Sequence, residues 1–127
     1  MKEFDTIAAV ATPIGVGGIT IIRISGDKAE ALADKIIFPK NGKSLFHQDS
    51  HKLTLSNIKR ISDGTILDEA LVAVMRGPNS YTGETTVEIN CHGGTVVMRK
   101  ILETVVKAGA RIAEPGEFTK RAFLNGR

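Results

Sequence analysis

The sequence predicts an α+β domain in which two to three helices cover a mixed β-sheet. Runs rich in Ile, Val and Thr recur along the chain, and stretches between them place apolar residues at helical spacing. The expected order is β-β-α-β-β-β-α-β-α, without an internal repeat. Such an irregular mixture of strands and helices favours a single domain over residues 1–127.

The amino-terminal third predicts two strands. Residues 6–11 form the first, and a glycine-rich turn at 12–18 leads into the second at 19–25. Isoleucines occupy both faces of the second strand, which indicates a central strand buried on both sides. Arg23 lies among them, so it requires a protein or ligand partner, because an unpaired buried charge is costly.

A helix and a long loop are expected next. Asp27 and Glu30 have the spacing of a helix-start box, and apolar residues at helical spacing predict a helix over 29–37. The polar stretch 39–49 contains no clear periodicity. We therefore expect it to be irregular.

The rest of the chain, from residue 53 onward, predicts four more strands and two helices. Strands are expected at 53–58, 67–75 and 86–92, and a short one at 111–113. A helix should begin near residue 95 and stop at Gly109, and a last helix should cover 117–124. In the strand at 86–92, residues alternate between two faces, with Val87, Ile89 and Cys91 on one and Glu88, Asn90 and His92 on the other.

Composition indicates a soluble cytoplasmic protein. The single cysteine, Cys91, excludes an internal disulfide, and its place on an apolar strand face predicts a buried structural thiol. No apolar run approaches the ~20 residues of a membrane-spanning helix. Lys and Arg exceed Asp and Glu by only 17 to 14. This small, dispersed excess does not indicate a nucleic-acid surface.

Motifs for nucleotides and metals are incomplete. The glycine run at 15–18 fails as a dinucleotide fingerprint, because Thr20 replaces the third glycine and a strand follows. The segment 42–44 lacks the leading glycine of a phosphate-binding loop. His47 and His51 have metal-ligand spacing, but their loop is not helical. We expect neither a GTP site nor a metal site in this chain.

Two polar groups carry alternative interpretations. Glu88 shares its strand face with Asn90, and its carboxylate can accept the paired N–H groups of a pterin or guanine edge. From the pattern alone, a solvated outer strand face is the better interpretation. Lys120, Arg121 and Arg127 form a basic cluster that suits either an anionic ligand or a solvated helix end.

Four long motifs together resemble one family. They are DTIAA followed by ATP and G at 5–15, GGI and RISG at 17–26, GPNSYTGE with VEI and HGG at 77–94, and RIAEPGEFTKRAFLNG at 111–126. Over nearly its whole length the chain resembles the amino-terminal domain of the MnmE (TrmE) tRNA modification GTPases. The resemblance is weakest at 39–60.

The resemblance implies a fold similar to the tetrahydrofolate-binding domain of the glycine-cleavage aminomethyltransferase. It implies binding of a formyl- or methylene-tetrahydrofolate and formation of a homodimer. It also implies a full-length protein that, with the flavin-dependent partner GidA (MnmG), modifies the wobble uridine of tRNA with a folate one-carbon unit. GTP, Mg and K would belong to a GTPase domain beyond this chain, which itself holds no convincing catalytic residue.

The same resemblance assigns folate contacts to Arg23, Glu88 and Arg127. For Glu88 it therefore favours a ligand contact over the solvated strand face that the pattern alone indicates. Asn90, His92 and Lys120 are expected as a second line of pocket residues. The family more often has lysine where Arg127 stands. Three other functions stay open: an aminomethyltransferase-like enzyme, a pure dimerisation scaffold without a folate pocket, and a tRNA-binding domain, which the weak net charge disfavours.

Overall fold

The computed structural model describes residues 5–11, 19–92 and 94–126, so the predicted turn at 12–18 and Arg127 lie outside the described residues. The described chain forms seven strands, three α-helices and a 3-10 helix. The strands are β1 (Ile7–Val10), β2 (Thr20–Ser25), β3 (Ile37–Pro39), β4 (Leu53–Lys59), β5 (Ile66–Met75), β6 (Thr86–Cys91) and β7 (Arg111–Ile112). The helices are α1 (Ala29–Asp34), η2 (Leu45–His47), α2 (Gly94–Ala108) and α3 (Glu117–Leu124).

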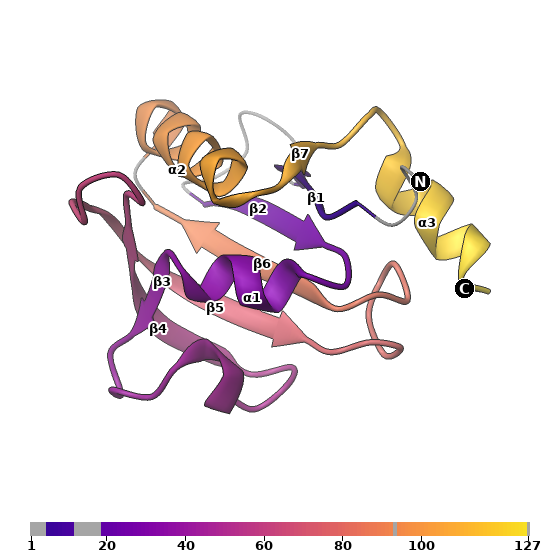
Figure 1. The fold of residues 1–127 in the computed structure, drawn as a ribbon, viewed down its shortest axis with the longest axis horizontal. Helices are drawn as coiled ribbons and strands as arrows, with labels where there is room; N and C mark the ends of the chain where they lie inside the picture. The colour runs from indigo at the N-terminus through magenta and orange to yellow at the C-terminus, as the bar shows by residue number, and fades with distance from the viewer. Residues whose placement is uncertain (1–4, 12–18, 93, 127) are drawn as a thin grey trace.

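The strands form one mixed sheet in the order β3-β4-β5-β6-β2-β1-β7 (Figure 1). β1 and β7 are parallel, and the other neighbouring pairs are antiparallel. The predicted α+β class with a mixed sheet is therefore confirmed. Among the helices of the described residues, none combines the length and the apolar character that a membrane span requires.

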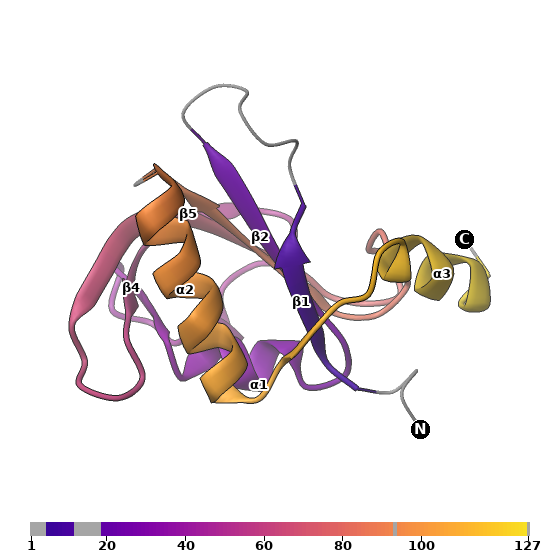
Figure 2. The same cartoon turned by 90° about the horizontal axis from the view of Figure 1, so that it is seen from above.

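The hydrophobic core lies between one face of the sheet and the helices α1 and α2 (Figure 2). Alternation along β2 and β6 directs Ile22, Ile24, Val87 and Ile89 into this core, and all four are fully buried. Full burial of each such side chain contributes roughly 1.5–3 kcal/mol.

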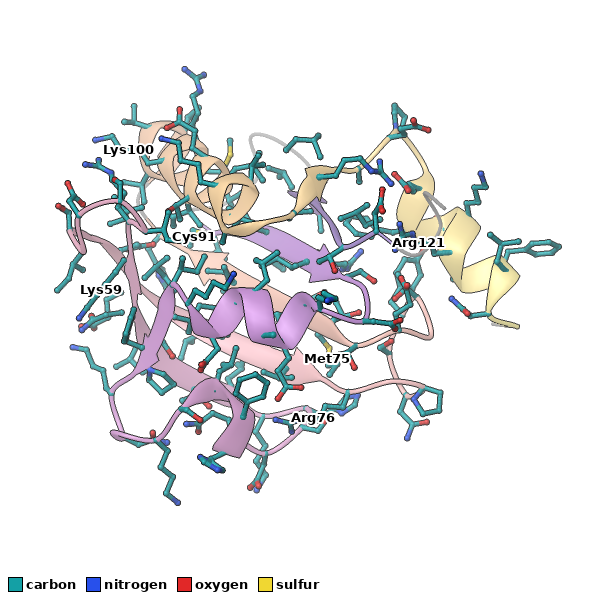
Figure 3. All side chains as sticks on the ribbon, viewed as in Figure 1. Lys59, Met75, Arg76, Cys91, Lys100 and Arg121 are labelled. Atoms are coloured by element: carbon teal, nitrogen blue, oxygen red, sulfur yellow. The ribbon has the colours of Figure 1, made fainter. Side chains whose placement is uncertain are left out.

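Cys91 belongs to this core, beneath α2 (Figure 3). Burial raises the pKa of its thiol to about 12, because the thiolate loses its hydration there. The prediction of a buried structural thiol is confirmed.

The expectation that strand 19–25 is buried on both faces is wrong. Ile22 and Ile24 are fully buried, whereas Ile19 is 48% exposed and Ile21 is half-buried. The reason is that α1 and α2 both pack on the same face of the sheet. We call the opposite side the open face; it carries Ile21, Arg23, Phe38, Leu53, Leu55, Leu71, Ala73, Glu88 and Asn90.

The predicted helix over 29–37 ends earlier, at Asp34. Ile37 instead begins β3 and pairs with Ile58, which buries both side chains. Pro39 follows closely, and a proline disfavours helical backbone in the residue before it.

The expected helix-start box at Asp27 and Glu30 is also wrong. The N-cap is Lys28, and it makes no side-chain cap bond. The carboxylate of Glu30 instead accepts bonds from Arg76, with Nη2 at 2.8 Å from Oε2.

The segment 39–49 is more ordered than predicted. It contains the 3-10 helix η2, and the guanidinium of Arg76 donates to the backbone carbonyls of Leu45, Phe46 and Gln48. Buried Gln48 adds side-chain bonds to the same segment. Hydrogen bonds from the Gln48 amide and the Arg76 guanidinium thus order this segment, which has no periodic apolar pattern.

Candidate functional site

The site is built around a cross-strand ion pair on the open face. Arg23 on β2 lies directly opposite Glu88 on β6, so the two side chains leave the same face of the sheet. Arg23 Nε donates to Glu88 Oε2 at 2.8 Å. The side chains remain 20% and 21% exposed, so solvent reaches the pair. Arg23 therefore has the partner that its strand position requires.

Short side chains flank this pair along the row of neighbouring strands. Ala9 of β1 lies opposite Arg23, and Ala73 of β5 lies opposite Glu88. Both alanines are half-buried. Because neither alanine reaches as far from the sheet as the charged groups, these two neighbours leave the pair accessible.

Two aromatic rings lie beside the guanidinium of Arg23. Its Cζ atom is 5.0 Å from the centre of the Tyr81 ring and 5.2 Å from that of Phe118. Both distances fall within the ≈ 6 Å range of cation–π attraction. Tyr81 comes from the loop between β5 and β6, and Phe118 comes from α3. Four separate segments therefore meet at Arg23.

Charged groups fasten α3 to the β5–β6 loop, residues 76–85. Arg121, only 2% exposed, points from α3 toward this loop (Figure 3). Its Nη1 lies 3.2 Å from both carboxylate oxygens of Glu84, and its Nη2 lies 3.4 Å from Glu117. Glu84 also accepts a bond from the buried Ser25 hydroxyl at 3.0 Å. Buried charges of opposite sign thus hold the helix in place.

Two further bonds complete this attachment. The Tyr81 hydroxyl and the Thr119 hydroxyl are 2.7 Å apart, which ties the loop to α3 directly beside Phe118. The Asn125 amide donates to the Thr82 carbonyl at 3.0 Å. The positions of the two rings are therefore set by the same contacts that attach the helix.

Glu117 connects α3 to β7. Its carboxylate accepts a bond from Arg111 Nη2 at 2.8 Å, and the Glu114 N–H donates to it as well. The Arg111 hydrogen bond holds the pKa of Glu117 at about 2, against the opposing effect of burial. The same pair raises the pKa of Arg111. Both groups are thus charged throughout the physiological range.

The structure brings together only part of the predicted folate set. Arg23 and Glu88 are bonded, while Arg127 lies outside the described residues. Asn90 shares the open face, but its amide donates to the Leu71 carbonyl at 2.9 Å. Asn90 thus lies on the same face as Glu88, but its amide is hydrogen-bonded to the neighbouring strand β5.

His92 and Lys120 lie away from the pair. His92 follows the last residue of β6 and is exposed, with its backbone N–H bonded to Asp68. Lys120 is exposed on α3, about 200° around the helix from Phe118, and lines a hollow of about 190 Å³ with Glu114. The described structure shows neither side chain in contact with Arg23 or Glu88.

Sequence reasoning missed three features of this region. Arg121 was grouped with a basic cluster, but the structure buries it between two carboxylates instead of presenting it to a ligand. Tyr81 and Phe118 carried no pattern of their own. A signal did exist: Tyr81 is the single tyrosine of the chain and lies in a Gly- and Ser-rich loop, where a large aromatic residue is uncommon.

Among the described residues, no group of three His, Cys, Asp or Glu side chains is arranged to hold a metal ion. His47 contacts the Ser44 hydroxyl, and His51 contacts the Asn79 carbonyl at 2.6 Å.

Known proteins with similar sequences agree on one family. The sequence model of the GTP-binding protein TrmE N-terminus matches residues 6–127. The chain is 52% identical over 98% of its length to the tRNA modification GTPase MnmE of Lysinibacillus sphaericus, and 55% identical over 97% to that of Carboxydothermus hydrogenoformans. It is 52% identical over its full length to the same protein of Geobacillus thermodenitrificans.

The chain spans about 27–28% of the length of these relatives. Its match covers the region that contains β1 to α3, including all four segments that meet at Arg23. The chain therefore belongs to the family of TrmE amino-terminal domains, which in these relatives is part of a tRNA modification GTPase.

Proposed function

We propose that this chain binds a reduced folate that carries a one-carbon unit, through the Arg23–Glu88 pair on the open face. The pair supports this function because it combines two kinds of group at one place. The Glu88 carboxylate accepts hydrogen bonds, and the Arg23 guanidinium donates them. The 2-amino-4-oxo edge of a pterin offers two N–H donors beside one carbonyl acceptor, which is the complementary arrangement.

The ion pair leaves hydrogen-bonding atoms of Arg23 and Glu88 available for a ligand. In the described structure, the ion pair is formed by one guanidinium nitrogen and one carboxylate oxygen, Nε and Oε2. Both side chains remain about one-fifth exposed. Glu88 therefore retains accepting capacity, and Arg23 retains donating capacity, toward the open face.

Calorimetric titration of 5-formyl-tetrahydrofolate into the chain tests this proposal. Wild type should bind saturably, and Glu88→Gln should lose binding, because the amide replaces one acceptor by a donor. Glu103→Gln is the matched control, since Glu103 is exposed on α2, which packs on the other face of the sheet. Equal affinity of wild type and Glu88→Gln would contradict the proposal.

We further propose that the open face forms a homodimer. Phe38, Leu53 and Leu55 are 42%, 60% and 42% exposed there, on neighbouring strands β3 and β4. Exposed apolar side chains that adjoin one another are typical of interaction surfaces. Sedimentation velocity should give a dimer for wild type and a monomer for Leu55→Glu. Val96→Glu, on the outer side of α2, should stay dimeric.

The larger role proposed for this domain concerns the complete protein. Its curated relatives are tRNA modification GTPases. We propose that the domain presents the folate for modification of a wobble uridine in tRNA, in the cytoplasm, with the flavin-dependent partner GidA (MnmG). GTP, Mg and K would act on the GTPase domain of the complete protein.

Two alternative functions make different predictions. A pure dimerisation scaffold would dimerise without binding any folate. An aminomethyltransferase-like enzyme would transfer a one-carbon unit by itself, and would show turnover with a tetrahydrofolate donor. The solvent-accessible ion pair of Arg23 and Glu88 supports binding, because its donor and acceptor atoms not used in the pair can contact a ligand.

A further inference from the structure

We propose that Tyr81 and Phe118 form an aromatic clamp that fixes the plane of the Arg23 guanidinium and thereby sets the specificity of the site for a pterin carbonyl. The inference rests on the proposed folate function. It assigns the two rings as positioning residues, which act on the ligand through Arg23.

The first step is the geometry of the guanidinium. Arg23 is held at one end by its Nε bond to Glu88, at 2.8 Å. Its Cζ atom lies within 5.0 Å and 5.2 Å of the two ring centres. A flexible arginine side chain otherwise samples many rotamers. One charged bond and two ring contacts together reduce the number of orientations open to the guanidinium.

The second step is that the clamp is itself held in place. The Tyr81 hydroxyl bonds to Thr119, the residue next to Phe118, at 2.7 Å. Arg121, 3.2 Å from Glu84, fastens the same helix to the same loop. The two rings therefore keep a fixed separation. Contacts within the chain thus hold both rings beside Arg23.

The third step links orientation to specificity. A guanidinium that is already oriented beside the Glu88 carboxylate can donate to a carbonyl without losing further conformational freedom. The same rigid donor meets an amino group unfavourably, because two donors then face each other and remain unpaired. The clamp should therefore favour a 4-oxo ring over a 4-amino ring.

The binding test compares tetrahydrofolate with tetrahydroaminopterin, which differ at the 4-position, by calorimetry. Wild type should prefer the 4-oxo ligand. Tyr81→Leu and Phe118→Leu should each reduce that preference about 3- to 30-fold, the range expected for loss of a cation–π contact. Tyr81→Phe keeps the ring and should retain most of the preference. The effect of Tyr81→Leu should vanish in an Arg23→Gln background, because the rings act through Arg23.

A second test needs no ligand. Tyr81 is the only tyrosine, so labelling with 3-fluorotyrosine gives a single fluorine resonance from the clamp. Arg23→Gln should shift that resonance, whereas Arg60→Gln, which alters an ion pair with Asp63 elsewhere, should not. An unshifted resonance in folded Arg23→Gln would refute the clamp independently of folate binding.

The outcomes separate the clamp from the folate function. If both pteridines bind and the preference survives loss of either ring, the specificity role is wrong while the folate site stands. If wild type binds neither pteridine, the proposed function fails, and the specificity role fails with it. A reduced preference with rescue by Tyr81→Phe supports both.

Discussion

Replacement of Arg121 by methionine should lower the free energy of unfolding of the domain, because it removes the positive charge between two buried carboxylates. Arg121 is 2% exposed, and the side chains of Glu84 and Glu117 are 11% and 10% exposed. Loss of one partner from a buried charge pair costs about 3–5 kcal/mol. Glu117 keeps Arg111 and Glu84 keeps Ser25. We therefore expect a loss near the lower limit, about 3 kcal/mol.

Urea unfolding at pH 7, followed by circular dichroism, measures this loss. A decrease of about 3 kcal/mol is a large part of the ~5–15 kcal/mol typical of a domain, and should lower Tm by about 10 °C. Lys120→Met is the matched control: it removes a charge from the adjacent, exposed position of α3 and should stay within about 0.5 kcal/mol of wild type. Equal stabilities of Arg121→Met and Lys120→Met would refute the argument.

Three further predictions concern stability and reactivity. Because the pKa of Glu117 is held at about 2 by its bond with Arg111, its charge stabilises the fold above pH ~4.5, and this contribution is lost as the pH falls toward 2. Urea unfolding of Glu117→Gln should show a deficit of about 2–3 kcal/mol at pH 7 that closes near pH 2; a constant deficit would contradict this. The thiol of Cys91, with its pKa raised to about 12, should resist a thiol reagent at pH 8 until urea is added, and rapid native labelling would be the contrary result. Gly26→Ala should lower stability by about 2 kcal/mol or more in thermal unfolding, since φ is +146° and a Cβ would lie 2.8 Å from Thr6 Cα; an unchanged Tm would argue against that strain.

Periodic segments of the fold were predictable from sequence. Alternation in 86–92 correctly gave the faces of Val87 and Glu88, and helical spacing located α2 and α3. The strand β3 was missed because three residues are too short to display a period, and Ile37 suits a helix pattern as well. The order of segment 39–49 was not predicted, because it comes from polar hydrogen bonds and not from an apolar period. Arg76, which is distant in sequence, bonds to backbone carbonyls of the segment, and the side chain of Gln48 bonds within it.

In the candidate site, only the residues whose side-chain direction is set by a strand were predictable from sequence. The side-chain direction of Glu88 follows from alternation, and the need of Arg23 for a partner follows from its apolar neighbours. The aromatic clamp depends on α3 meeting the β5–β6 loop, a contact that no local pattern specifies. Arg121 has the sequence context of a surface charge, and only the tertiary structure shows that it is buried.

The most direct test of the folate function is a crystal structure of the chain with 5-formyl-tetrahydrofolate. The proposed function predicts the amino-pyrimidinone edge of the pterin on the carboxylate of Glu88, with the Arg23 guanidinium beside the 4-oxo group and between Tyr81 and Phe118. A folate bound elsewhere, for example in the hollow lined by Lys120, with no contact to Arg23 or Glu88, would contradict it.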